Sequence, residues 1–61
     1  MDIFLSGGSI LGARMTYEIF LAVMTDDFVG PDDFIPVKLE DGTRVAVRKG
    51  DVCAFCENTE L

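Results

Sequence analysis

The chain has 61 residues, of which 49% are apolar, and its 11 acidic and 5 basic side chains give a net charge of −6. A chain this short forms one small domain, here residues 1–61, and buries only about 60% of the surface that its unfolded form exposes. The acidic excess argues against a general nucleic-acid binder, which needs Lys and Arg for phosphate contacts, and the absence of histidine removes the commonest general base and metal ligand.

The N-terminal segment is apolar but does not have the pattern of a targeting signal. Asp2 stands where a secretory signal peptide carries positive charge. Polar and charged side chains interrupt residues 3–24, so no stretch reaches the roughly 18 apolar residues of a membrane span. We therefore expect a cytoplasmic protein without a membrane partner. Within this segment residues 3–5 predict a short strand that ends at Gly7 and Gly8.

Residues 15–24, MTYEIFLAVM, fit two kinds of element. Every odd position is apolar, whereas the even positions begin polar with Thr16 and Glu18 and end apolar. This pattern is typical of a strand that is half exposed at its start and buried at its end, and a strand is our first interpretation. A helix over residues 11–24 is the alternative, and it would be apolar over nearly its whole circumference.

Residues 26–34, DDFVGPDDF, place two Asp-Asp-Phe units on either side of a turn. A calcium loop of the EF-hand type is excluded, because Phe28 and Gly30 occupy positions that need oxygen ligands. The simplest interpretation is an exposed loop that its aspartates keep in water. The alternative is a contact surface, in which the turn at Gly30 and Pro31 holds the two units together and each phenylalanine lies beside a double negative charge.

Residues 34–49, FIPVKLEDGTRVAVRK, predict a β-hairpin. A three-residue loop over residues 40–42, with Gly42 in the left-handed conformation, brings all the β-branched residues to one face. Pro36 lacks an N–H, so its strand lies at an edge or pairs on one side only there. The predicted pairs are Leu39 with Thr43, Val37 with Val45 and Ile35 with Val47 on one face, and Lys38 with Arg44 on the other, with Arg48 near the end of the ladder.

The C-terminal part predicts a last strand at residues 52–56, followed by a polar, frayed tail at residues 57–61. Cys53 and Cys56 have the spacing of a redox or zinc pair, but strand alternation sends their sulfurs to opposite faces. A zinc site needs four ligands, so only a dimer that pooled two pairs could form one. The cysteines are otherwise structural thiols.

Together these elements predict a mainly β fold. Four or five short strands form a small antiparallel sheet, either open or curled toward a small SH3-like barrel. The alternative is an α+β fold with the helix at residues 11–24 packed on a three-stranded antiparallel sheet.

No motif in the chain supports catalysis. The glycines do not form a phosphate-binding pattern, and the serines have no histidine to activate them. We expect neither an enzyme nor a bound cofactor. The remaining candidate is the acidic surface, which suits a basic, nucleic-acid-binding protein as partner. The expected contact residues are Asp26, Asp27, Phe28, Asp32 and Asp33, with Glu40 and Asp41 at the hairpin tip extending the acidic face.

In size, charge and single-domain layout the whole chain resembles the phage-encoded inhibitors of host defence nucleases, including the anti-CRISPR proteins, some of which mimic DNA. The resemblance rests on character and not on a residue motif. It implies an inhibitor, which acts in the host cytoplasm if the chain is phage-encoded. We expect a monomer rather than a homodimer.

Two other functions compete with this one. A nucleic-acid-binding module of the small β-barrel type would use Lys38, Arg44, Arg48 and Lys49, with Phe34 for base stacking. A structural subunit of a larger assembly would have its apolar residues 15–24 covered by a neighbour.

Overall fold

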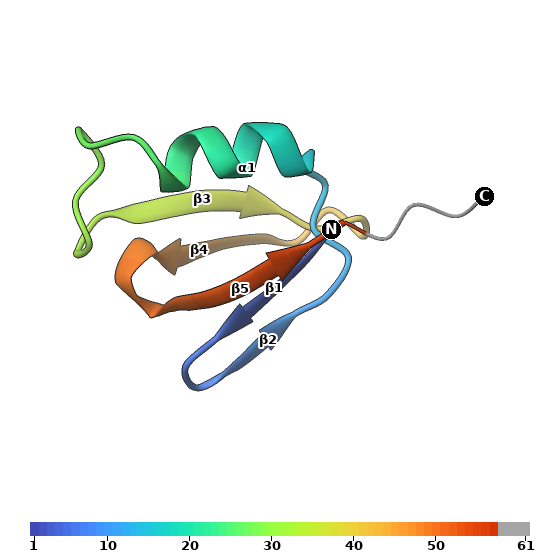
Figure 1. Cartoon of the computed structure of the whole chain (residues 1–61). Helices are drawn as coiled ribbons and strands as arrows, with labels where there is room; N and C mark the ends of the chain where they lie inside the picture. Colours follow the sequence, from blue (N-terminus) through green and yellow to red (C-terminus); the bar gives the residue numbers. More distant parts are fainter. Residues whose placement is uncertain (58–61) are drawn as a thin grey trace.

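The computed structural model describes residues 1–57, which form a mainly β protein with five strands and one short α-helix (Figure 1). The frayed tail expected at residues 57–61 lies outside the described residues except for Glu57, whose carboxylate accepts a hydrogen bond from the N–H of Tyr17 at 3.1 Å. In chain order the elements are β1 (Asp2–Leu5), β2 (Gly8–Ile10), α1 (Tyr17–Met24), β3 (Phe34–Lys38), β4 (Arg44–Arg48), the 3-10 turn η1 (Lys49–Asp51) and β5 (Val52–Cys56).

The strands of residues 1–57 form two antiparallel sheets, where the sequence predicted one. The first has the strand order β2-β1-β5, and the second is the β3–β4 hairpin. A single bridge between Ala13 and Leu39 connects the segment after β2 to the end of the hairpin. Strand β2 was not predicted, because the glycines at positions 7 and 8 indicated only the end of β1. In the structure they begin a return strand that pairs Leu5 with Gly8.

The hairpin has the predicted register. Val37 pairs with Val45, Ile35 with Val47 and Lys38 with Arg44. The N–H of Leu39 donates to the carbonyl of Thr43 at 2.8 Å, and the N–H of Gly42 donates to the carbonyl of Leu39 at 3.0 Å. Gly42 has a φ of 92°, so its predicted left-handed conformation is confirmed. Within residues 1–57 β3 pairs only with β4, as Pro36 requires.

We expect Gly42→Val to destabilise the protein by about 1–2 kcal/mol or somewhat more, because an L side chain is strained at positive φ. No atom lies within 4 Å of the position that a Cβ would take, so this cost comes from the backbone alone. Urea unfolding measures it. Gly8→Val is the matched control, because Gly8 lies in β2, has open space around it and lacks a positive φ. Equal effects of the two substitutions would contradict the turn geometry.

Residues 17–24 are helical, so the strand expected over residues 15–24 is wrong. The Thr16 hydroxyl caps the helix by accepting a hydrogen bond from the N–H of Ile19 at 3.2 Å. Of the helix side chains only Phe20 is fully buried, while Val23 and Met24 are partly buried against the core. The alternative helix was right in kind but began too early. The apolar odd positions did not distinguish the two elements, because this helix is apolar on its exposed side as well.

The core lies between the two sheets and α1, and residues of β1, α1, β3 and β4 contribute its buried side chains. Figure 1 shows α1 on one side of the strands. The rings of Phe20 and Phe55 meet edge to face with their centroids 4.8 Å apart.

Strand β5 contains a bulge, because Phe4 pairs with Ala54 and Leu5 with Val52. Strict alternation therefore does not hold across β5. Its two partly buried residues are Val52 and Phe55, and its cysteines are both exposed. Among residues 1–57 the buried core residues are Ile3, Ala13, Phe20, Ile35, Val37 and Val47.

Candidate functional site

The segment between α1 and β3 is a loop with its own hydrogen bonds, which we call the aspartate loop (residues 26–33). The Asp26 carboxylate accepts from the N–H of Phe28 at 2.9 Å, and the Asp33 carboxylate accepts from the N–H of Gly30 at 2.8 Å. The N–H of Asp33 returns a bond to the carbonyl of Gly30 at 3.1 Å. Two of the four aspartates thus form turns in the way that Asp commonly does. The predicted turn at Gly30 is present.

The 3-10 turn η1 fixes the aspartate loop to the end of the hairpin. The Lys49 ammonium donates to the carbonyl of Asp26 at 2.9 Å and to that of Val29 at 2.6 Å. The backbone N–H of Lys49 donates to the carbonyl of Asp33, and that of Gly50 to the carbonyl of Pro31. A Cβ on Gly50 would lie 2.9 Å from the Pro31 carbonyl oxygen, so only glycine allows this approach. The loop is therefore tied to the fold at both ends and in its middle.

Phe28 lies at the surface of this fixed loop and is 97% exposed. A core position for this residue is thereby excluded. The side chain of Asp32 is 93% exposed, and Phe34 at the start of β3 is 65% exposed. Asp27 is exposed as well. The loop therefore presents an aromatic ring and exposed carboxylates to the solvent on a backbone that is already ordered.

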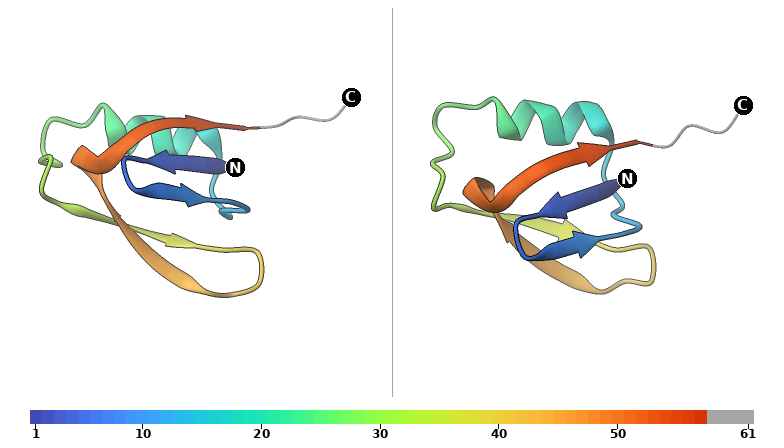
Figure 2. Two further views of the ribbon diagram at one scale, coloured as in Figure 1. Left: turned by 90° about the horizontal axis from the view of Figure 1, so that it is seen from below. Right: turned by 60° about the horizontal axis from the view of Figure 1, so that its bottom comes forward.

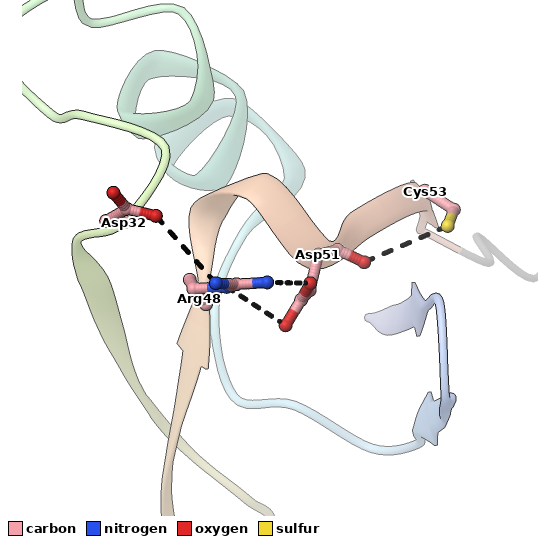
Figure 3. Close-up of polar contacts among 4 residues, drawn as sticks. All are labelled: Asp32, Arg48, Asp51 and Cys53. Atoms are coloured by element: carbon pink, nitrogen blue, oxygen red, sulfur yellow. Dashed lines mark hydrogen bonds and ion pairs between the residues drawn. The ribbon is translucent and has the colours of Figure 1, made fainter.

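Arg48 compensates part of the acidic charge beside the loop (Figure 3). Its guanidinium makes two hydrogen bonds to Asp51, at 2.7 and 3.2 Å, and lies 3.7 Å from Asp32. The hydrogen bond from Arg48 lowers the pKa of the Asp51 carboxyl, and Asp51 in turn raises the pKa of Arg48. Figure 3 also shows the Cys53 sulfur directed at the Asp51 carbonyl, 3.8 Å away. Arg48 is thus committed to internal contacts.

These contacts divide the basic strip that a nucleic-acid module would need. Lys49 and Arg48 hold the aspartate loop and its neighbour Asp51, while Lys38 and Arg44 lie at the other end of the hairpin. The strip therefore consists of two separate pairs, and one of them is engaged within the protein.

The hairpin tip does not extend the acidic face of the aspartate loop. Figure 2 shows the tip, between β3 and β4, at the opposite end of the hairpin from the loop. The N–H of Glu40 donates to the carbonyl of Gly12 at 3.0 Å. The Asp41 carboxylate accepts from the N–H of Thr43 at 2.9 Å, and this bond lowers the pKa of Asp41. The whole length of β3 therefore separates Glu40 and Asp41 from the loop aspartates.

Residues 1–57 also contain an open cleft and two cysteines. An open cleft of about 480 Å³ lies beside the start of α1, where Thr16 already caps the helix and Glu57 bonds to it. Its one hydroxyl and its one carboxylate among the described residues therefore already accept hydrogen bonds from the helix backbone. Among the first 57 residues no group of three or more Cys, Asp or Glu side chains is arranged to hold a metal ion. Cys53 and Cys56 are free. The cleft is lined by Arg14, Met15, Thr16, Ile19 and Glu57.

No helix in residues 1–57 is long and apolar enough to cross a membrane. Comparison of the chain with models of protein families, with curated proteins and with solved structures finds no match. The geometry of the aspartate loop is therefore the basis for the function proposed below.

Lys49→Met should loosen this loop, because it removes the ammonium that bonds to two loop carbonyls and keeps most of the apolar stem. We expect a loss of stability of about 1 kcal/mol and faster amide hydrogen exchange at Val29 and Gly30. Lys38→Met is the control, since Lys38 lies on the exposed side of β3 near the far end. If both variants leave loop exchange unchanged, the Lys49 contacts do not order the loop.

Proposed function

We propose that the protein binds a basic, nucleic-acid-binding surface of another protein through the aspartate loop and so inhibits that protein. The observation that carries the proposal is the position of Phe28, which is 97% exposed on a loop whose backbone is held by Lys49 and Gly50. An aromatic side chain is costly to leave in water and is a common anchor in protein interfaces. A loop that is ordered before binding loses less conformational entropy when the complex forms.

The charges around Phe28 indicate the kind of partner. Asp27 and Asp32 are exposed carboxylates on either side of the ring in the chain, and the protein as a whole has a net charge of −6. Carboxylates on a short, ordered loop can occupy the positions that phosphates would take in a basic groove. They also speed encounter with a positively charged protein. Inhibition follows if the partner uses the same groove for nucleic acid, which is the mode implied by the resemblance to phage inhibitors of host nucleases.

A second function, as a subunit of a larger assembly, is favoured by the outer side of α1. Ile19 is 56% exposed and Leu21 is 40% exposed, so the helix presents apolar side chains to solvent. A neighbouring subunit that covered this side would remove them from water.

Affinity capture tests the two functions together. Wild-type protein, a variant with Asn at all four loop aspartates, and Ile19→Gln/Leu21→Gln are each immobilised and exposed to lysate from cells in which the gene is expressed. We expect wild type to retain a basic protein that the loop variant loses and the helix variant keeps. Nucleic acid added to the isolated complex should then displace the protein. If the loop variant retains the captured protein and the helix variant loses it, the result favours the function as a subunit of an assembly. If the captured protein binds nucleic acid and this protein at the same time, inhibition by occupation of the groove is excluded.

A further inference from the structure

The outer edge of β4 is an unpaired strand edge. Residues 39 and 43 exchange a hydrogen bond across the hairpin, and so do residues 33 and 49 at its other end. Hydrogen-bonded pairs alternate along an antiparallel ladder, so Val45 and Val47 bond to β3. The backbone N–H groups of Arg44, Ala46 and Arg48 therefore point away from β3. Within residues 1–57 none of these three N–H groups has a hydrogen-bond partner, and β4 pairs with no strand other than β3.

The opposite edge of the hairpin is closed to an added strand. Pro36, directly across from Ala46, has no N–H to offer. The carbonyl of Lys38 accepts a hydrogen bond from the N–H of Arg14 at 2.7 Å, and the N–H of Glu40 donates to Gly12. Proteins commonly protect their strand edges in these ways. In the described part of the chain the β4 edge contains no proline, and no strand pairs with it on that side.

We propose that the outer edge of β4 binds an extended segment of a partner protein, which adds to the hairpin as a third strand and places a carboxylate opposite Arg44. This surface is centred on Ala46 and reaches the aspartate loop at Arg48, which lies 3.7 Å from Asp32. The inference does not depend on the function proposed for that loop. The backbone of the added strand would supply the affinity, and its side chains would set the specificity.

A second copy of the chain is a poor occupant of this edge. If two β4 strands paired antiparallel about Ala46, Arg44 of each copy would lie opposite Arg48 of the other. Like charges directly across a ladder are destabilising. The net charge of −6 on each copy adds to the repulsion.

The charges on β4 favour an acidic residue of the added strand at the Arg44 end and not at the Arg48 end. Arg44 and its cross-strand neighbour Lys38 are exposed and form no ion pair within the described residues. Arg48 is already bonded to Asp51. A carboxylate opposite Arg44 would therefore lie near two cations that have no ion pair in the described residues. A carboxylate opposite Arg48 would have to displace Asp51. On the other side of β4, half-buried Val45 offers contact to the alternate, apolar residues of the added strand.

The test uses the capped peptide acetyl-Val-Thr-Val-Thr-Val-Glu-Val-amide with a polyethylene-glycol tail for solubility. Paired antiparallel with its central Thr opposite Ala46, it places Glu opposite Arg44. Added to the ¹⁵N-labelled protein up to about 2 mM, it should slow amide exchange at Arg44, Ala46 and Arg48 and leave Val45 and Val47 unchanged. N-methylation of the central Thr should abolish binding, whereas N-methylation of the next Val, whose N–H faces away from β4, should not. Glu replaced by Gln in the peptide, or Arg44→Gln in the protein, should each weaken binding about two- to fivefold.

Ala46→Pro removes the central outward N–H without removing a bond to β3, and it should abolish binding while the spectrum of the core stays in place. Three results would overturn the proposal: no response of the three amides at the highest peptide concentration, equal binding by the two N-methylated peptides, or shifts centred on α1 or the aspartate loop. Dimerisation of the free protein with slow exchange at these amides would instead show that a second copy occupies the edge, contrary to the argument from Arg44 and Arg48.

Discussion

Phe20→Ala is expected to leave much of the protein unfolded at 25 °C. The side chain is 0% exposed and meets the ring of Phe55 edge to face at 4.8 Å. Truncation of a buried phenylalanine costs about 3–5 kcal/mol. The whole stability of a chain of this size is about 3–9 kcal/mol at 0.05–0.15 kcal/mol per residue. Urea unfolding followed by circular dichroism measures the loss.

Ile19→Ala is the control for this prediction, since Ile19 is the preceding helix residue and is 56% exposed. We expect it to cost less than about 1 kcal/mol. The pair also tests the element itself. In a strand over residues 15–24 the odd positions would share a face, and a buried odd face would make Ile19 the more sensitive residue. A larger loss from Ile19→Ala than from Phe20→Ala would therefore contradict the helix.

The sequence predicted the hairpin correctly and the element at residues 15–24 wrongly. The reason is the sequence separation of the interactions that determine each element. The hairpin was predicted in register because its determinants are local: Gly42 fixes the loop length, and the β-branched residues agree with only one pairing. The helix was not predicted first, because residues 15–24 are apolar at most positions and so fit both the two-residue period of a strand and the 3.6-residue period of a helix. Its burial is decided by contact with Phe55, more than thirty residues away. The cap at Thr16 was the local signal for a helix start.

In the aspartate loop, too, the local features were predicted and the long-range contacts were not. Its composition predicted an exposed turn with two aromatic side chains, and the structure places Phe28 and Phe34 in solvent. The role of Lys49 was missed because its bonds join residues 20 and 23 positions apart. Lys49 was instead grouped with the basic residues of an outer sheet face. The tip residues were grouped with the loop by charge alone, although the predicted strand between them already separates the two ends.

The second large effect is expected at the aspartate loop. Removal of its charges should change the rate of association with the partner, whereas removal of its aromatic ring should change the rate of dissociation. Replacement of Asp26, Asp27, Asp32 and Asp33 by Asn keeps the side-chain volume and removes four charges. Asn also keeps an oxygen acceptor for the turn hydrogen bonds that positions 26 and 33 make. The fold should therefore persist. Association with the captured basic partner should slow by about tenfold or more, and its dependence on salt should become weaker.

The hairpin tip supplies a matched control for charge. Glu40→Gln/Asp41→Asn removes two charges at the far end of β3, a five-residue strand that spans about 17 Å. The Debye length is about 8 Å at physiological ionic strength. If the loop is the contact, the tip variant should associate nearly as fast as wild type. Equal slowing by the tip variant would mean that net charge alone steers the partner and that the loop is not the site.

Phe28→Ala should act on dissociation. The ring is 97% exposed in the free protein, so its removal should change the melting temperature of the free chain by no more than a degree or two. In the complex the same ring would be desolvated, and truncation of an interface anchor costs about 2 kcal/mol or more, which corresponds to dissociation about thirtyfold faster. Surface plasmon resonance on the captured partner separates the two rates. The exposed Phe34→Ala, on the neighbouring strand, is the comparison for a general loss of aromatic surface. Dissociation that is as slow for Phe28→Ala as for wild type would remove Phe28 from the interface, and with it the observation on which the proposed function rests.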